Sequence, residues 1–123
     1  MEKDLSKSER FSITLSYMSE FVSLYVTAPS HQVAANIGRA LVEGRLAACV
    51  NIIPGMHSIY RWQGKIEAAA EVVLIAKSRA TLFEEIEKRI RELHPYDCPC
   101  IVAWPIEAGY QPYLDWIAQE TTS

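Results

Sequence analysis

Alternation between apolar and polar residues divides the chain into segments of strand and helix character. Residues 21–27 (FVSLYVT) are rich in β-branched and aromatic side chains, which predicts a strand. Ser30 follows Pro29 and fits a helix N-cap, and apolar residues then recur at helical spacing until Gly44, which fits a C-cap. The chain therefore opens with a strand followed by a helix.

The middle of the chain predicts one long β-hairpin. A mostly apolar run begins at Leu46, and Pro54-Gly55 interrupts it, which predicts a bulge or bend because proline cannot donate to a β-ladder. The strand resumes and continues to Trp62, Gln63-Gly64 supplies a tight turn, and the return strand ends at Lys77. A hairpin of about 30 residues is far longer than two average strands, so we expect it to overhang the domain.

A second helix, a last strand and a terminal helix complete the pattern. Thr81 and Glu84 have capping-box spacing, and an apolar stripe follows them. Pro95 ends this helix at or before the preceding residue, because a residue before proline avoids the helical region. Residues 100–104 (CIVAW) predict a strand, and Pro112 suits the first turn of a short helix over residues 113–117.

The order β-α-β-β-α-β with an added helix predicts a ferredoxin-like α+β fold, an antiparallel sheet with two helices on one face. We expect one domain over residues 20–120, and a mobile tail over residues 1–19, which are polar and rich in serine. The overhanging hairpin would expose strand edges that pair readily with other chains. We therefore expect an oligomer.

Composition narrows the classes of partner. The net charge is −3 and the Lys and Arg residues are dispersed, which argues against a nucleic-acid-binding surface. No apolar run approaches the length of a transmembrane helix, so we expect no membrane partner. The three cysteines cannot all pair within the chain, and the N-terminus does not resemble a signal peptide. We expect a cytoplasmic protein in a reducing compartment.

The stretch HPYDCPC, residues 94–100, concentrates the candidate metal chemistry. His94 is either a ligand or a polar residue at a helix C-terminus. Cys98 and Cys100 lie two apart, so in a strand both thiols would point to one face and could hold a soft ion such as Cu(I). The alternative is that both are buried structural thiols.

Two further residues are candidates for binding a small ligand. Lys77 ends the long apolar strand and either binds an anion beside a cleft or extends to solvent. Tyr96 either stacks on a ligand or packs, with Trp104, Tyr113 and Trp116, between the last strand and the terminal helix. Tyr60 and Trp62 near the hairpin tip indicate interface anchors. No nucleophile triad, phosphate-binding loop or zinc-protease motif is present in the sequence, so we expect no enzyme.

Four stretches resemble the CutA family of divalent-ion tolerance proteins. They are residues 26–30 (VTAPS), residues 41–67, residues 93–99 (LHPYDCP) and residues 113–117 (YLDWI), and the resemblance covers about residues 20–118. It implies a ferredoxin-like fold assembled as a homotrimer in which neighbouring hairpins pair. It also implies a role in metal tolerance, with copper or another divalent metal as the possible ion, and an architecture like that of the PII signalling proteins.

The chain departs from the copper-binding pattern that this resemblance implies. The family pattern has a cysteine in the first strand and two histidines before Pro-Tyr, whereas this chain has Val26 and Leu93 at the first two of these positions, and only His94 remains. We therefore expect a softer site of His94, Cys98 and Cys100 that takes Cu(I) or Zn(II). The alternative function is a PII-like sensor that binds a small molecule or anion between subunits.

Overall fold

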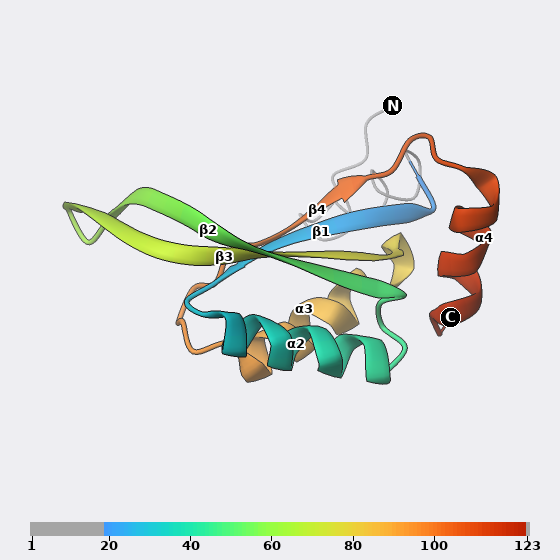
Figure 1. Cartoon of the computed structure of the whole chain (residues 1–123), viewed down its shortest axis with the longest axis horizontal. Helices are drawn as coiled ribbons and strands as arrows, with labels where there is room; N and C mark the ends of the chain where they lie inside the picture. Colours follow the sequence, from blue (N-terminus) through green and yellow to red (C-terminus); the bar gives the residue numbers. More distant parts are fainter. Residues whose placement is uncertain (1–18, 123) are drawn as a thin grey trace, which may run out of the picture.

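A computed structural model describes residues 19–122 of the 123-residue chain. Its elements follow the order β-α-β-β-α-β with an additional C-terminal helix, as Figure 1 shows. This arrangement confirms the ferredoxin-like α+β fold predicted from the sequence. Of the tail predicted over residues 1–19, all but the last residue lies outside the described part.

Four antiparallel strands form one sheet in the spatial order β2-β3-β1-β4. The central strand β1 (Phe21–Ala28) lies between β3 (Lys65–Arg79) and β4 (Ile101–Pro105), and β2 (Cys49–Trp62) pairs with the outer side of β3. Five of the eight residues of β1 are apolar and buried, as expected for a strand with neighbours on both sides. β4 begins one residue later than the sequence predicted.

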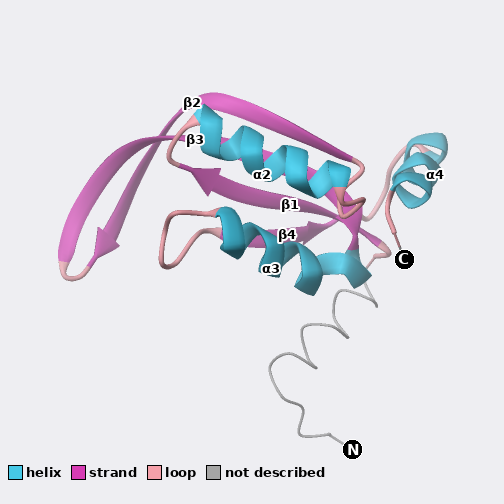
Figure 2. Cartoon of the chain, turned by 90° about the horizontal axis from the view of Figure 1, so that it is seen from below, coloured by secondary structure: helices cyan, strands magenta, loops and turns pink. Residues whose placement is uncertain are grey.

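Two helices cover one face of this sheet (Figure 2). They are α2 (His31–Glu43) and α3 (Phe83–Leu93), and both turn an apolar stripe towards the strands. The core between the layers contains fully buried Leu24, Ile37, Leu74, Ile86 and Ile90. Burying one such side chain contributes about 1.5–3 kcal/mol, so this layer contact stabilises the fold.

The helix ends agree with the sequence prediction at three of four points. The Ser30 side chain accepts a hydrogen bond from the Val33 backbone N–H and caps the start of α2, and Gly44 is the C-cap at its end. Helix α3 ends at Leu93, just before the His-Pro pair. The predicted capping box at Thr81 is wrong. A 3-10 turn over Ala80–Leu82 carries Thr81 inside a helical turn, so its hydroxyl is not at the N-cap.

The C-terminal helix α4 (Gln111–Glu120) is longer than the predicted segment and packs at the end of the sheet rather than on its face (Figure 1). Pro112 lies in its first turn, as predicted. Buried Ile117 packs in a second apolar cluster with Phe21 and Ala48. Arg79 ties the helix to β3 through hydrogen bonds to the Ala118 carbonyl and the Thr121 hydroxyl.

The β2–β3 hairpin projects beyond the helices and the other two strands (Figure 1). The predicted bulge lies where the pairing shifts between Ile53 and Met56, around Pro54 and Gly55. A two-residue turn joins Trp62 to Lys65, and its Gly64 has φ 82°, a conformation that glycine adopts without steric cost. Within residues 19–122, no helix or further strand covers the projecting part, and Ile59 and Ile66 are 77% and 69% exposed.

The face of the sheet opposite α2 and α3 carries an aromatic surface. Tyr25 of β1 stacks on Trp104 of β4 with ring centroids 5.2 Å apart, and Trp104 remains 52% exposed. Val102, two residues away on the same face, is also exposed. Large apolar groups gathered on one face are typical of a surface that another protein covers. Within the described part of the chain, no helix is both long and apolar enough to cross a membrane.

Candidate functional site

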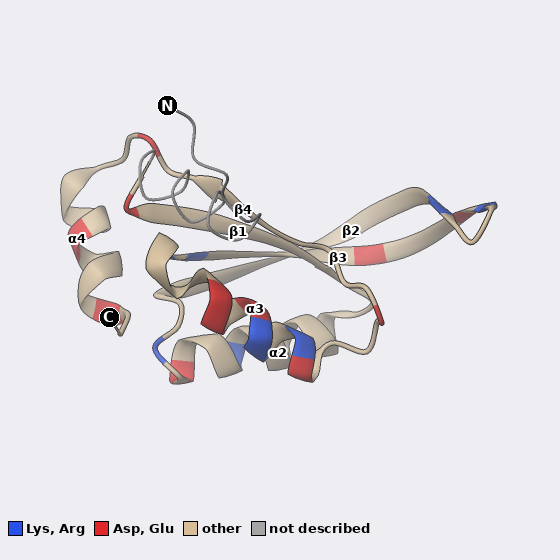
Figure 3. Cartoon of the chain, turned by 180° about the vertical axis from the view of Figure 1, so that it is seen from behind, with Lys and Arg blue, Asp and Glu red and all other residues tan. Residues whose placement is uncertain are grey.

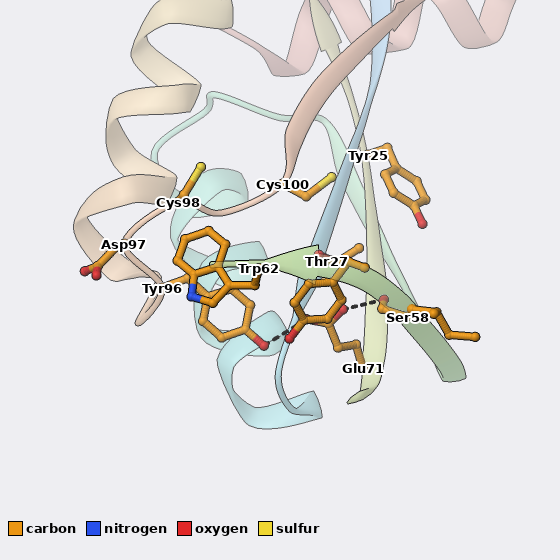
Figure 4. A pocket seen from close by; sticks show the side chains of 11 residues that line it. Tyr25, Thr27, Ser58, Trp62, Glu71, Tyr96, Asp97, Cys98 and Cys100 are labelled. Carbon is orange, nitrogen blue, oxygen red and sulfur yellow. Dashed lines mark hydrogen bonds between the residues drawn. The ribbon is translucent and has the colours of Figure 1, made fainter. Parts of the chain in front are cut away.

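A cavity of about 530 Å³ lies where the projecting hairpin meets the open face of the sheet (Figure 4). Its walls come from β1, from both strands of the hairpin and from the loop between α3 and β4. A volume of this size falls in the usual range for small-molecule sites. The cavity is therefore the candidate site of this chain.

Glu71 is the central polar group of this cavity. The residue is only 8% exposed, and it lies at the point where β3 leaves the body of the sheet and enters the projecting hairpin. The Ser58 hydroxyl donates to Oε1 of Glu71 at 2.6 Å, and the Tyr96 hydroxyl donates to Oε2 at 2.8 Å. Figure 4 shows these two donors reaching the carboxylate from β2 and from the loop after α3. The charge is thus held in place from two sides.

The carboxylate changes the proton affinity of its neighbours. Burial first, and the hydrogen bond to Glu71 second, raise the pKa of Tyr96 to about 12. Burial and the negative charge of Glu71 also raise the pKa of the Cys100 thiol, against a smaller opposing effect of a Thr27 hydrogen bond. Near neutral pH both groups therefore keep their protons, and the cavity has the net charge of its carboxylates.

Aromatic rings form much of the wall around Glu71. Tyr25 comes from β1, Tyr60 and Trp62 from the end of β2, and Tyr96 from the loop after α3. Trp62 is 46% exposed in the single chain, so its ring faces a space that protein does not fill. The cavity combines a fixed anionic group with several π-faces.

His94 is buried behind this cavity and does not line it. Its Nε2 donates to the Thr27 carbonyl at 2.8 Å, and its Nδ1 accepts from the Tyr96 backbone N–H at 3.2 Å. These two contacts fix the neutral tautomer with the proton on Nε2 and tie the start of the loop to β1. A metal ion bound by His94 would have to replace one of them.

Cys98 and Cys100 lie on the wall of the cavity, and both residues are exposed. The prediction of a strand through both is wrong, since β4 begins only at Ile101 and Pro99 between them has no N–H for a ladder. The alternative of buried structural thiols is also wrong. Among residues 19–122, no group of three or more His, Cys, Asp or Glu residues is arranged to hold a metal ion.

Lys77 lies away from the cavity. Its ammonium group donates to the Asn51 side chain at 3.2 Å, and the residue pairs across the sheet with Ser23 and Cys49. Lys77 and Glu71 are six residues apart on one strand, a separation of about 20 Å. The fold therefore does not bring Lys77 and Tyr96, the two predicted ligand-binding residues, into one site.

The prediction that Tyr96, Trp104, Tyr113 and Trp116 pack together between the last strand and the terminal helix is wrong, because their ring contacts lie elsewhere. Tyr113 and Trp116 of α4 lie with ring centroids 5.6 Å apart, whereas Trp104 stacks on β1 and Tyr96 packs on His94. Cys49 Sγ and the Tyr113 hydroxyl form a hydrogen bond at 3.3 Å. This bond is the larger cause, and burial the smaller one, that raises the pKa of Tyr113 to about 12.

Sequence reasoning missed Glu71 and Ser58, which are central to the cavity. Glu71 begins the apolar run EVVLIAK, where a carboxylate beside buried valines was the available signal. Ser58 gave no signal of its own, because its role depends on the cross-strand register of the hairpin.

Comparison with known proteins assigns relatives to this chain. The sequence model of the CutA1 divalent ion tolerance protein family matches residues 22–120. The chain is 50% identical over 96 residues to the divalent-cation tolerance protein CutA of Thermus thermophilus, covering 78% of this chain and 93% of that protein. It is 46% identical over 99 residues to mouse protein CutA, covering 80% of this chain but only 56% of the mouse protein.

The fold agrees with these sequence matches. The solved structure of the divalent cation tolerance protein Cut A1 from Thermus thermophilus superposes with a TM-score of 0.82 and 47% identity. The superposition covers 83% of this chain and 99% of the solved chain. Sequence and fold therefore point to the same group of proteins.

Proposed function

Because the chain belongs to the CutA1 divalent ion tolerance protein family, we propose that it is a homotrimeric, non-enzymatic binding protein that acts in tolerance of divalent metal ions. Copper is the ion that we assign to it, bound as Cu(I), with Zn(II) as the second choice. The observation that carries the assignment is the pair of exposed thiols, Cys98 and Cys100, on one cavity wall.

Thiolates are the ligands that soft metal ions prefer, and hard ions such as Mg²⁺ prefer oxygen ligands. Each thiol loses its proton when it binds the metal, so affinity rises with pH. Because the pKa of Cys100 is raised, metal affinity should keep rising to higher pH than it would for an ordinary thiol. His94 holds the loop that carries both cysteines, and it would join them as a ligand only by giving up one of its present contacts.

Trimer formation is supported by the surfaces that the single chain leaves open. The projecting hairpin and the aromatic surface around Trp104 expose apolar groups that a neighbouring copy can cover. The three free cysteines favour a reducing compartment, and we place the protein in the cytoplasm on that ground.

The metal proposal is tested on the reduced full-length protein by competition with a Cu(I) chelator, together with native mass spectrometry. We expect a trimer that binds Cu(I), and affinity that rises with pH and falls at least tenfold in Cys98→Ser/Cys100→Ser. Cys49→Ser is the matched control, because Cys49 contacts Tyr113 and does not line the cavity. Equal Cu(I) affinity of the double variant and the wild type would disprove the thiolate site.

The alternative of a PII-like anion sensor lacks comparable support. Its predicted cation, Lys77, is bound to Asn51 and does not line the cavity. Arg61 of the hairpin does not line it either. The charged residues that do line it, Glu71 and Asp97, are both acidic and would repel an anion.

A further inference from the structure

The polar groups that face the cavity present hydrogen-bond acceptors. The hydroxyl protons of Ser58 and Tyr96 are both committed to Glu71, so each oxygen offers only lone pairs to a ligand. Each carboxylate oxygen of Glu71 accepts one hydrogen bond here and has capacity for another. Asp97 also lines the cavity, with its carboxylate directed outward at the rim, and adds negative charge nearby (Figure 4). A ligand that satisfies this lining must bring donors and positive charge.

The aromatic wall favours the same kind of ligand. A cation over the face of a tryptophan or tyrosine ring is attracted by the ring quadrupole, most strongly where water is excluded. Trp62, Tyr60 and Tyr96 provide such rings around the buried carboxylate. The two features act together, since the carboxylate fixes the charge and the rings surround the organic part of the ligand.

We propose that this cavity binds a small organic ammonium ion, a protonated primary amine with an apolar substituent. The ammonium group donates to Glu71 and to the Ser58 and Tyr96 oxygens, and the substituent lies against the rings. A bare metal ion does not account for a space of about 530 Å³ with aromatic walls. This site goes beyond the role in metal tolerance and does not depend on the cysteines.

No basic side chain of the described residues lines the cavity to neutralise Glu71. Arg61 and Lys65 lie near the far tip of the hairpin. Figure 3 shows basic positions at this tip beside one acidic position of β3, and a second acidic position of β3 nearer the body of the sheet. The charge of Glu71 is therefore compensated by hydrogen bonds alone, and it remains available to a cationic ligand.

The test is calorimetric titration of the metal-free, assembled full-length protein with 2-phenylethylammonium near neutral pH. The neutral 2-phenylethanol and the anionic 3-phenylpropanoate are probes of matched shape. We expect the ammonium probe to bind at least tenfold more tightly than either, and less tightly as salt is raised. Equal binding of the alcohol and the ammonium ion would overturn the proposal, because the cavity would then be a general apolar site.

Variants separate the carboxylate from nonspecific charge. Glu71→Gln should weaken ammonium binding about tenfold or more, as expected for loss of a charge-assisted hydrogen bond. Glu67→Gln removes the same charge from an exposed position of the same strand and should change affinity less than about twofold. Asp97→Asn, at an exposed loop position, should weaken binding about threefold and serves if Glu71→Gln does not fold.

Two outcomes bear on the neighbouring proposal and on the assembly. Copper binding is measured by chelator competition and ammonium binding by calorimetry on the metal-free protein, so failure of one proposal is distinguished from failure of the other. A structure of the assembled protein in which a Lys or Arg of a neighbouring copy occupies the cavity and contacts Glu71 would also overturn the ammonium site. Unchanged affinity in both Glu71→Gln and Asp97→Asn would do the same.

Discussion

Glu71 is the residue on which the cavity depends, since β2, β3 and the loop after α3 all meet at its carboxylate. A buried carboxylate is tolerated only where hydrogen bonds replace its lost hydration, and Ser58 and Tyr96 supply them. The same contacts hold the loop that carries both exposed thiols. The Glu71 side chain thus links the projecting hairpin to the loop that carries Cys98 and Cys100.

The tyrosine partner of this carboxylate makes a prediction at alkaline pH. The pKa of Tyr96 is about 12 in the folded chain and close to 10 in an unfolded one, so the folded state holds this proton more tightly. The resulting stability is complete below pH 10 and is lost as pH rises from about 10 to 12. Tyr96→Phe should flatten this part of the stability curve, measured by guanidinium unfolding at several pH values.

Ultraviolet titration of tyrosinate provides the control for that prediction. Tyr96 and Tyr113 should ionise late in the folded protein, each with a pKa of about 12. Glu71→Gln should bring the ionisation of Tyr96 to lower pH and leave Tyr113 unchanged, because Tyr113 is bound to Cys49 instead. A late Tyr96 in the Glu71→Gln variant would show that burial alone sets its pKa.

At the scale of elements, the packing of α2 on β2 depends on the absence of a side chain at Gly38. A Cβ atom placed there would lie 2.9 Å from Cγ1 of Val50, closer than two carbon atoms can pack. Helix α2 therefore lies close to the sheet at Gly38, and Val50 packs against the hydrophobic core between the helices and the sheet.

Gly38→Ala should therefore destabilise the chain by about 1–3 kcal/mol through overpacking. Helix propensity alone predicts the opposite sign, with a gain of up to about 1 kcal/mol. In the Val50→Ala background, Gly38→Ala should cost less stability than it does in the wild type, because the Val50 methyl group that would clash is absent. Denaturation midpoints at one fixed protomer concentration measure both effects, and a stabilising Gly38→Ala would contradict the close approach.

At the scale of the whole molecule, the open face of the sheet and the projecting hairpin are two surfaces without a partner layer within the described chain. The open face has Trp104 stacked on Tyr25, and the hairpin has exposed Ile59 and Ile66. Both surfaces are apolar, and the proposed trimer would cover them with neighbouring copies.

Trp104→Asp should turn the proposed trimer into smaller species without unfolding the chain. The Trp104 indole is half exposed in the single chain, so the fold of the chain depends little on this side chain. A carboxylate buried at an interface between copies, in contrast, is costly. Sedimentation velocity at micromolar concentration measures the species, and circular dichroism checks the fold. Tyr110→Asp, at a residue 77% exposed outside the strands, is the matched control. A trimer of normal stability in Trp104→Asp would exclude this face from the interface.

Most elements could be predicted because their causes are local. The Ser30 cap, the stop before Pro95, the Gln63-Gly64 turn and the bulge at Pro54-Gly55 each depend on residues adjacent in the chain. The spacing of apolar residues then indicated which face of each helix and strand is buried, and the order of the elements is typical of the ferredoxin-like topology. The capping box failed because β3 passes directly into a 3-10 turn, a boundary that depends on where the sheet pairing ends.

The cavity was decided only in three dimensions. Ser58 meets Glu71 because the register of the hairpin, shifted by a bulge, places them together, and Tyr96 meets it because His94 ties the loop to β1. The sequence alone determined the fold class, the family resemblance and the candidate thiols, since these follow from local pattern and residue type. Which side chains share a site depends on contacts between residues far apart in the chain, and those are set by strand register and by packing of the layers.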